Sequence, residues 1–220
     1  MGLDQMEAIL GKIGGIVWGP YLLVPLLLGT GLYLTIRLQG IQLVRLGAAL
    51  RLGLLKRRDD DAEGDISQFQ ALTTAMAATV GTGNIVGVAT AIAAGGPGAL
   101  FWMWVTAILG MASKYAEAFL GVRFRTTDEV GEKNGGPQYY LERGIPNGFG
   151  RFLALCFAIF AVCACFGIGN MTQGNSIASN LERSFMIPTW ITGIVLAGLT
   201  LVVVVGGIKS IGKETAGLAP

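Results

Sequence analysis

Long stretches without a charged residue dominate this 220-residue chain. They cover Ile13–Ile36, Ile66–Ser113, Phe152–Leu181 and Ser184–Ile208, which are 24, 48, 30 and 25 residues long. A helix needs about 20 apolar residues to cross a hydrocarbon core of roughly 30 Å. Only 14% of all residues are charged, against about 25% in soluble domains. We therefore expect an all-α integral membrane protein rather than a soluble domain.

The charge-free runs predict five transmembrane helices. The 48-residue run is too long for one helix, and we expect it to break at Gly95-Gly96-Pro97-Gly98, where neither helix nor strand is favoured. The alternative, helices buried in a large soluble core, would require several such runs in one short chain. The predicted spans lie near residues 14–36, 67–94, 98–122, 150–181 and 188–207.

The positive charges predict how the chain crosses the membrane. Thirteen of the sixteen Lys and Arg residues fall on one side of the predicted spans, and that side is normally cytoplasmic. The N-terminus is then outside and the C-terminus of this chain inside. In Ile41–Leu55, arginines lie among leucines, which predicts a helix on the inner membrane surface. We expect the acidic cluster Asp59–Asp61 to be a solvated loop.

These observations divide the chain into three parts. Residues 1–40 contain the first span, residues 41–66 form the cytoplasmic amphipathic segment and acidic loop, and residues 67–220 contain the other four spans. The small net charge of +2 indicates no nucleic-acid partner. The chain has no histidine, which excludes Ser-His and Cys-His catalytic pairs and His-ligated zinc. No enzyme activity is therefore expected.

The second span should be discontinuous. As one helix, residues 67–94 would measure about 42 Å, well beyond the thickness of the hydrocarbon core. Its middle contains Gly81, Thr82, Gly83 and Asn84, which are poor helix formers. A break within a membrane requires that the freed backbone groups face protein, water or a ligand, as in secondary transporters. The alternative is that Gly81, Gly83 and Gly87 simply permit close helix packing.

Two further groups of polar residues lie within the predicted spans. Lys114 and Glu117 are three residues apart and can pair on one helix face, and Lys114 could instead extend to the headgroups. We expect Glu117 to accept hydrogen bonds from the broken helix rather than to contact substrate. Asn170 and Gln173 also share a face. That face either makes interhelical hydrogen bonds or lines a water-accessible cavity, and the sequence leaves both alternatives open.

Five motifs resemble those of the sodium:alanine/glycine symporter family, in order and over nearly the whole chain. They are Thr74–Ala89, Gly95–Ala99, Lys114–Glu117, Gly135–Tyr140 and Gly169–Asn175. The family is similar in fold to the bacterial leucine transporter, with ten core helices in two inverted five-helix repeats. The resemblance implies that this chain holds the first part of that fold, with one additional N-terminal helix, and lies in the plasma membrane.

The resemblance also implies what individual residues do. A small neutral amino acid, alanine or glycine, would contact Gly81, Thr82, Gly83 and Asn84, and Gln173 would reach the same cavity from another helix. Sodium would be the coupling ion, with no other cofactor, and the backbone carbonyl groups of Ala77 and Val80 would bind it. Hard cations prefer such oxygen ligands.

One departure from the family pattern affects this expectation. The chain ends at Pro220, before the second repeat, so we expect an N-terminal portion whose sites are completed by a missing C-terminal repeat. The leading hypothesis is sodium-coupled symport of alanine or glycine. The alternatives are a non-transporting membrane fragment or subunit that needs a second half, and a proton-coupled amino-acid transporter.

Overall fold

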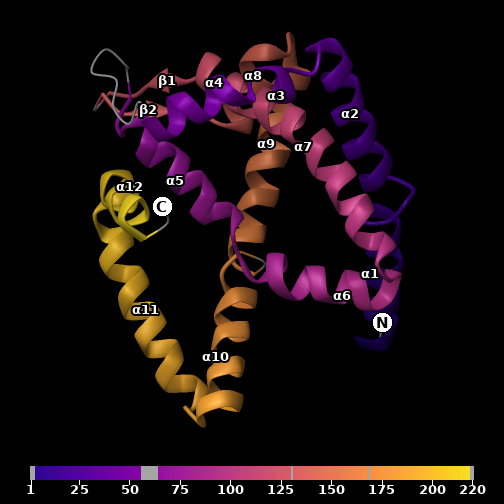
Figure 1. The fold of residues 1–220 in the computed structure, drawn as a ribbon, viewed down its shortest axis with the longest axis vertical. Helices are drawn as coiled ribbons and strands as arrows, with labels where there is room; N and C mark the ends of the chain where they lie inside the picture. Colours follow the sequence, from indigo (N-terminus) through magenta and orange to yellow (C-terminus); the bar gives the residue numbers. More distant parts are fainter. Residues whose placement is uncertain (1–2, 56–63, 130, 168, 219–220) are drawn as a thin grey trace. The chain divides into compact units, whose positions relative to one another are not determined.

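The computed structural model describes residues 3–55, 64–129, 131–167 and 169–218, which are almost entirely helical (Figure 1). A single antiparallel hairpin within these residues pairs β1 (Thr126–Thr127) with β2 (Lys133–Asn134). The predicted all-α class is confirmed. The helices are α1 (Leu3–Val17), α2 (Leu23–Arg37), α3 (Ile41–Val44), α4 (Leu46–Leu50), η1 (Arg51–Leu55), α5 (Gln68–Thr79), η2 (Gly83–Gly87), α6 (Val88–Gly95), α7 (Gly98–Arg123), α8 (Pro137–Gly144), α9 (Gly148–Cys165), α10 (Met171–Phe185), α11 (Thr189–Val205) and α12 (Gly207–Leu218).

The chain divides into two compact units. The first contains Met1–Gly47 and Gly95–Phe119, and the second contains Ala48–Ala94 and Leu120–Pro220. In the first unit, α2 lies against α7: a Cβ atom added to Gly31 would come within 2.9 Å of the Leu109 carbonyl oxygen. In the second unit, α5 packs against α12 and η1, α8 packs against α9, and α10 packs against α11.

The first predicted span is not one helix. The structure ends α1 at Val17 and begins α2 at Leu23, so the prediction of a continuous helix over 14–36 is wrong. Gly19-Pro20 lies between the two helices. This dipeptide interrupts helices because proline has no N–H to donate and clashes with the preceding turn. Gly19 and Pro20 could therefore have predicted this break from the sequence alone.

The amphipathic segment also differs from its prediction. Ile41–Leu55 is divided into α3, α4 and η1 rather than forming one helix. Its start is fixed by Gln39 and Gly40, which both have positive φ angles and turn the chain out of α2. The Gln42 side chain is buried and donates to the Thr35 hydroxyl at 2.9 Å. The acidic cluster Asp59–Asp61 lies outside the described residues.

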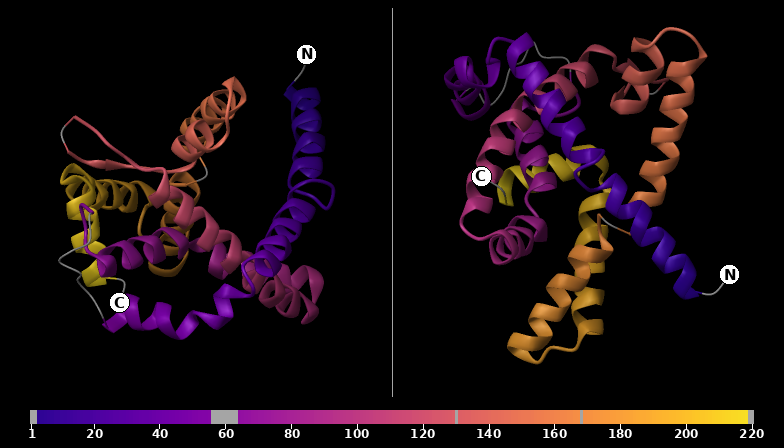
Figure 2. Two further views of the ribbon diagram at one scale, coloured as in Figure 1. Left: turned by 90° about the horizontal axis from the view of Figure 1, so that it is seen from above. Right: turned by 90° about the vertical axis from the view of Figure 1, so that its right-hand side faces the viewer.

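The remaining predicted spans have mixed outcomes. The expected span 98–122 is one helix, α7, and the expected span 188–207 corresponds to α11. The expected span 150–181 is two helices, α9 and α10, separated by a segment that contains Gly167 and Gly169. After α11, the chain bends by 118° into α12 (Figure 2). Gly207 has a φ of +65° at this bend, a conformation that glycine adopts without strain.

Among the described residues, only α9 is by itself long and apolar enough to cross a membrane. Two bent pairs of helices, α5 with residues 83–95 and α11 with α12, would bring the number of such spans to three if each pair counts as one. Five spans therefore stay a prediction.

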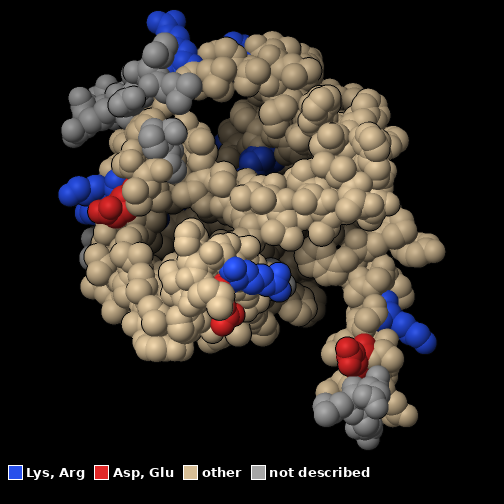
Figure 3. All heavy atoms as spheres, turned by 60° about the horizontal axis from the view of Figure 1, so that its bottom comes forward, with Lys and Arg blue, Asp and Glu red and all other residues tan. Residues whose placement is uncertain are grey.

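Large apolar side chains are exposed along most of the described helices. Among the residues that the structure describes, the buried apolar side chains are those of Ala112, Ala154 and Ala178, whereas Phe160 is 71% and Val202 is 76% exposed. The face drawn in Figure 3 is mostly uncharged, with Lys, Arg, Asp and Glu confined to a few places. An apolar surface of this extent requires lipid or further protein around it.

Candidate functional site

The helix α5 leads to the candidate site and has a well-defined start. The Ser67 hydroxyl accepts from the Gln70 amide at 3.2 Å, while the Gln70 side chain accepts from the Ser67 amide at 2.9 Å. This reciprocal capping box satisfies two amide groups that the first turn of a helix leaves free. It begins the helix within one residue of the predicted start at 67.

The helix stops at Thr79, where the sequence predicted a break. Val80 has extended backbone angles, with φ −79° and ψ +117°. The chain resumes as the single π-helical turn η2 before α6, and the two halves are bent by 56°. Such π-turns are frequent at functional sites. Gly81, Gly83 and Asn84 explain the break, because residues of low helix propensity do little to keep this stretch helical.

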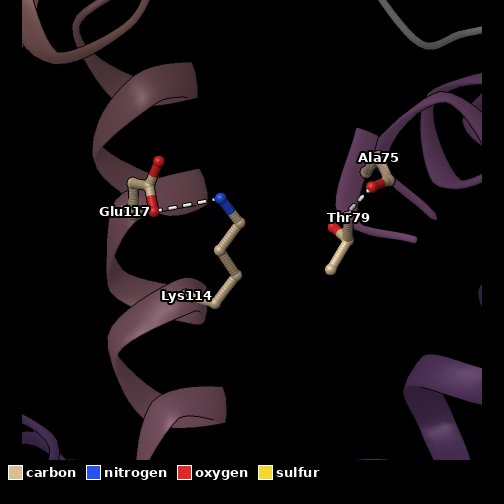
Figure 4. Close-up of polar contacts among 4 residues, drawn as sticks. All are labelled: Ala75, Thr79, Lys114 and Glu117. Atoms are coloured by element: carbon tan, nitrogen blue, oxygen red, sulfur yellow. Dashed lines mark hydrogen bonds and ion pairs between the residues drawn. The ribbon is translucent and has the colours of Figure 1, made fainter. Parts of the chain in front are cut away.

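Two side-chain hydrogen bonds lie at the break, one within the last turn of α5 and one across the break. The Thr79 hydroxyl donates to the Ala75 carbonyl at 2.7 Å (Figure 4). The Asn84 side-chain amide donates to the Thr79 carbonyl at 3.1 Å and so bridges the break. The Asn84 backbone amide donates to the Gly81 carbonyl at 3.0 Å. Asn84 therefore satisfies a carbonyl group that the last turn of α5 would otherwise leave free.

Gly81 lies next to Gln173 of α10. A Cβ atom at position 81 would be 3.2 Å from the Gln173 side-chain nitrogen and 3.6 Å from its oxygen. A Cβ atom at Gly83 or Gly87 would meet no atom of the described residues within 4 Å. Among the described residues, close packing therefore explains only Gly81 of these three glycines. Its neighbour is the polar carboxamide of Gln173.

Asn170 has a local role at the start of α10. Its side-chain oxygen accepts from the Met171 amide at 2.7 Å, and asparagine is a favoured helix-capping residue. Gln173 lies in the first turn of the same helix. Gly81 and Gln173 thus lie together, and Asn170 caps the helix that carries Gln173.

Lys114 and Glu117 form the predicted pair on α7. The Lys114 Nζ lies 3.1 Å from the Glu117 Oε2 (Figure 4). Both side chains are substantially exposed within the described chain, by 68% and 47%. Glu117 and the break belong to different units, so its expected bonds to the broken helix stay a prediction.

The proposed sodium ligands lie at the end of α5. Ala77 is in the last turn, where carbonyl groups have no following turn to bond to, and Val80 is the first residue beyond it. Thr82 and Gly83 follow at the start of the π-turn. Near the break lie Gly81 beside the Gln173 carboxamide, the Asn84 carboxamide bonded to the Thr79 carbonyl, and the end of α5 with Ala77 and Val80.

Two contacts at α5 and the residues just before it have no counterpart among the predictions from sequence. Asp65, just before α5, accepts from the Lys133 amide of β2 at 3.1 Å. The hydroxyl groups of Thr74 and Thr215 lie 3.0 Å apart and join α5 to α12. These pairs are separated by 68 and 141 residues, so no local pattern could have indicated them.

The chain matches the sodium:alanine symporter family over residues 3–220. It is 55% identical over 214 residues to the sodium/alanine symporter AgcS of Methanococcus maripaludis, covering 97% of this chain and 47% of that protein. It is 37% identical over 208 residues to the probable sodium/glutamine symporter GlnT of Bacillus subtilis, covering 94% and 42%. It is 40% identical over 187 residues to the amino-acid carrier protein AlsT of Bacillus subtilis, covering 84% and 38%.

The chain spans about half the length of the curated relatives it matches. The family and these relatives are transporters rather than enzymes, and a symporter family implies a membrane location. The match extends over the break, over α7 and over α10, where the resembling motifs lie. This chain therefore belongs to the sodium:alanine symporter family.

Proposed function

We propose that the complete gene product is a sodium-coupled symporter of small neutral amino acids, alanine or glycine, in the plasma membrane. The observation that carries this proposal is the break after α5, where Gly81 faces the Gln173 carboxamide in a chain of a symporter family. Side-chain-free backbone at positions 81 and 83 leaves room for the backbone of an amino-acid ligand. Discontinuous helices bind substrate and ion in this way in secondary transporters.

Each candidate residue has a proposed role in this site. Gly81, Thr82, Gly83 and Asn84 would bind the substrate from the α5–α6 side, and Gln173 would bind it from α10. The carbonyl oxygens of Ala77 and Val80 would bind sodium. The proposed topology keeps five spans, an external N-terminus and an internal end of this chain. The first repeat of a leucine-transporter-like fold would then be completed by a second half.

A substitution at Asn84 tests the role of the break. Asn84→Ala removes the hydrogen bond to the Thr79 carbonyl and leaves a polar group without a partner. We expect labelled-alanine uptake to be abolished while the protein level in the membrane is unchanged. Asn180→Ala is a matched control, because the Asn180 amide makes a comparable local bond to the Ser176 carbonyl at 2.8 Å. Uptake by Asn84→Ala equal to that of the control would contradict the proposed site.

A further inference from the structure

The second unit buries the start of α5 more than it buries the turn next to the break. Residues 65–70 are half-buried and Thr73 is only 2% exposed, whereas residues 75–80 are exposed. Gly212 of α12 lies against Ile66, since a Cβ atom at 212 would be 3.2 Å from the Ile66 methyl carbon. The packing thus holds the first two turns of α5 and leaves the turn next to the break uncovered by this unit.

A hydrogen bond also fastens the start of α5 to the β1–β2 hairpin. The Asp65 Oδ2 accepts from the Lys133 backbone amide at 3.1 Å. Asp65 stands two residues before Ser67, the capping residue of α5. Asp65 therefore links the hairpin to the residues that begin the discontinuous span.

The hairpin is built as a firm support for this contact. The two carboxylate oxygens of Asp128 accept from the Glu132 amide at 2.8 Å and from the Asn134 side chain at 3.0 Å. Gly135, just after β2, lies close to the end of α7: a Cβ atom there would come within 2.8 Å of the Gly121 carbonyl oxygen. The hairpin is thus tied internally by Asp128, and Gly135 lies against the backbone of residues 120–123, the part of α7 that belongs to the same unit.

We propose that Asp65 is a positioning residue that latches the hairpin to the start of α5 and holds this end of the discontinuous span closed. By the charge pattern this end faces the cytoplasm. The inference rests on the proposed transport function, because it assumes that α5 changes position when the site opens to the inside. Loss of the latch shifts the population toward the open position.

Cysteine labelling of the complete gene product measures this opening without any transport assay. Cys156, Cys163 and Cys165 are replaced by alanine, and Ala75→Cys, in the exposed turn of α5, serves as the probe. Inside-out membrane vesicles are treated with a membrane-impermeant maleimide. Asp65→Ala should raise the labelling rate about fivefold, the effect of losing about 1 kcal/mol of hydrogen bonding. Asp65→Asn should stay close to the parental rate, because its amide oxygen still accepts from Lys133.

A second variant displaces the hairpin without touching Asp65. Gly135→Ala places a methyl group against the Gly121 carbonyl, and it should also raise labelling. Gly121→Ala is the matched control, since a Cβ atom there meets nothing within 4 Å, and Glu129→Gln controls for loss of a hairpin carboxylate. Both controls should label at the parental rate.

The outcomes separate the latch from the transport proposal. Parental labelling of Asp65→Ala and Gly135→Ala, with both proteins present in the membrane, would overturn the latch, as would an Asp65→Asn rate as high as that of Asp65→Ala. If labelling responds as expected but the parent takes up no amino acid under a sodium gradient, the latch stands and the proposed function is wrong. If uptake is sodium-driven but labelling does not change, the proposed function stands and the latch is wrong.

Discussion

At the break between α5 and α6, Gly81 leaves room for the carboxamide of Gln173. These two residues are 92 positions apart in the chain, so only the family resemblance predicted that they share a site. The break itself was predictable from local chemistry, since two glycines and an asparagine within a charge-free run weaken a helix. The hydrogen bond from Asn84 across the break was not predictable, because it depends on the path that the broken chain takes.

Gly81→Ala should impair uptake through the Gln173 side chain. The added methyl group would be 3.2 Å from the Gln173 nitrogen, so the carboxamide must move from its present position. We expect the KM for alanine to rise about tenfold, equivalent to about 1.4 kcal/mol of binding free energy. Initial rates of labelled-alanine uptake over a range of concentrations measure this change.

Gly87→Ala is the control for Gly81→Ala. A Cβ atom at position 87 meets no described atom within 4 Å, and alanine favours helix more than glycine does. Its KM should equal that of the parent. An equal rise in both variants would show that the glycines act through backbone flexibility and not through the neighbourhood of Gln173.

Glu117 and Lys114 are predicted to differ in importance. They form a 3.1 Å pair in which both side chains are substantially exposed, and such pairs contribute little stability. If Glu117 also accepts from the broken helix, Glu117→Ala should lower the uptake rate severalfold, whereas Lys114→Ala should leave it nearly unchanged. Equal effects in the two variants would indicate that the pair is the whole role of Glu117.

At the scale of elements, glycine and proline decide where the helices end. The sequence indicated helices in nearly all of the right places, but the predicted spans 14–36 and 150–181 each ran through a break. Gly19-Pro20 was a readable signal for the first break. For the second, Gly167 and Gly169 alone gave a weak signal, because isolated glycines are tolerated within helices.

The contact between α5 and α12 should stabilise the second unit. The hydroxyl groups of Thr74 and Thr215 are 3.0 Å apart, and the Thr215 hydroxyl also lies 2.9 Å from the Ile211 carbonyl oxygen. Thr74→Val and Thr215→Val should each lower the free energy of unfolding by about 1 kcal/mol. The double variant should cost less than the sum, because both substitutions remove the same bond. Thermal unfolding of the purified protein measures the four stabilities, and strict additivity would contradict the contact.

At the scale of the whole molecule, the exposed apolar surface is explained by a location in the membrane, because the described residues bury little of their own apolar surface. Ala112, Ala154 and Ala178 are buried, while the large apolar side chains of α7, α9 and α11 are mostly exposed. Composition alone predicted this environment. Contacts within the second unit, such as that of Asp65 with Lys133, could not be predicted, because they are set by tertiary packing and not by periodicity.

The central claim, sodium-coupled symport of a small neutral amino acid, is tested most directly by uptake into proteoliposomes. The complete gene product is reconstituted, and accumulation of labelled alanine is followed with and without an inward sodium gradient, with unlabelled glycine and glutamine as competitors. We predict concentrative uptake that requires the sodium gradient, ceases when a sodium ionophore is added, and is inhibited more by glycine than by glutamine. Uptake that ignores the sodium gradient, or that a proton gradient drives in its place, would contradict sodium-coupled symport.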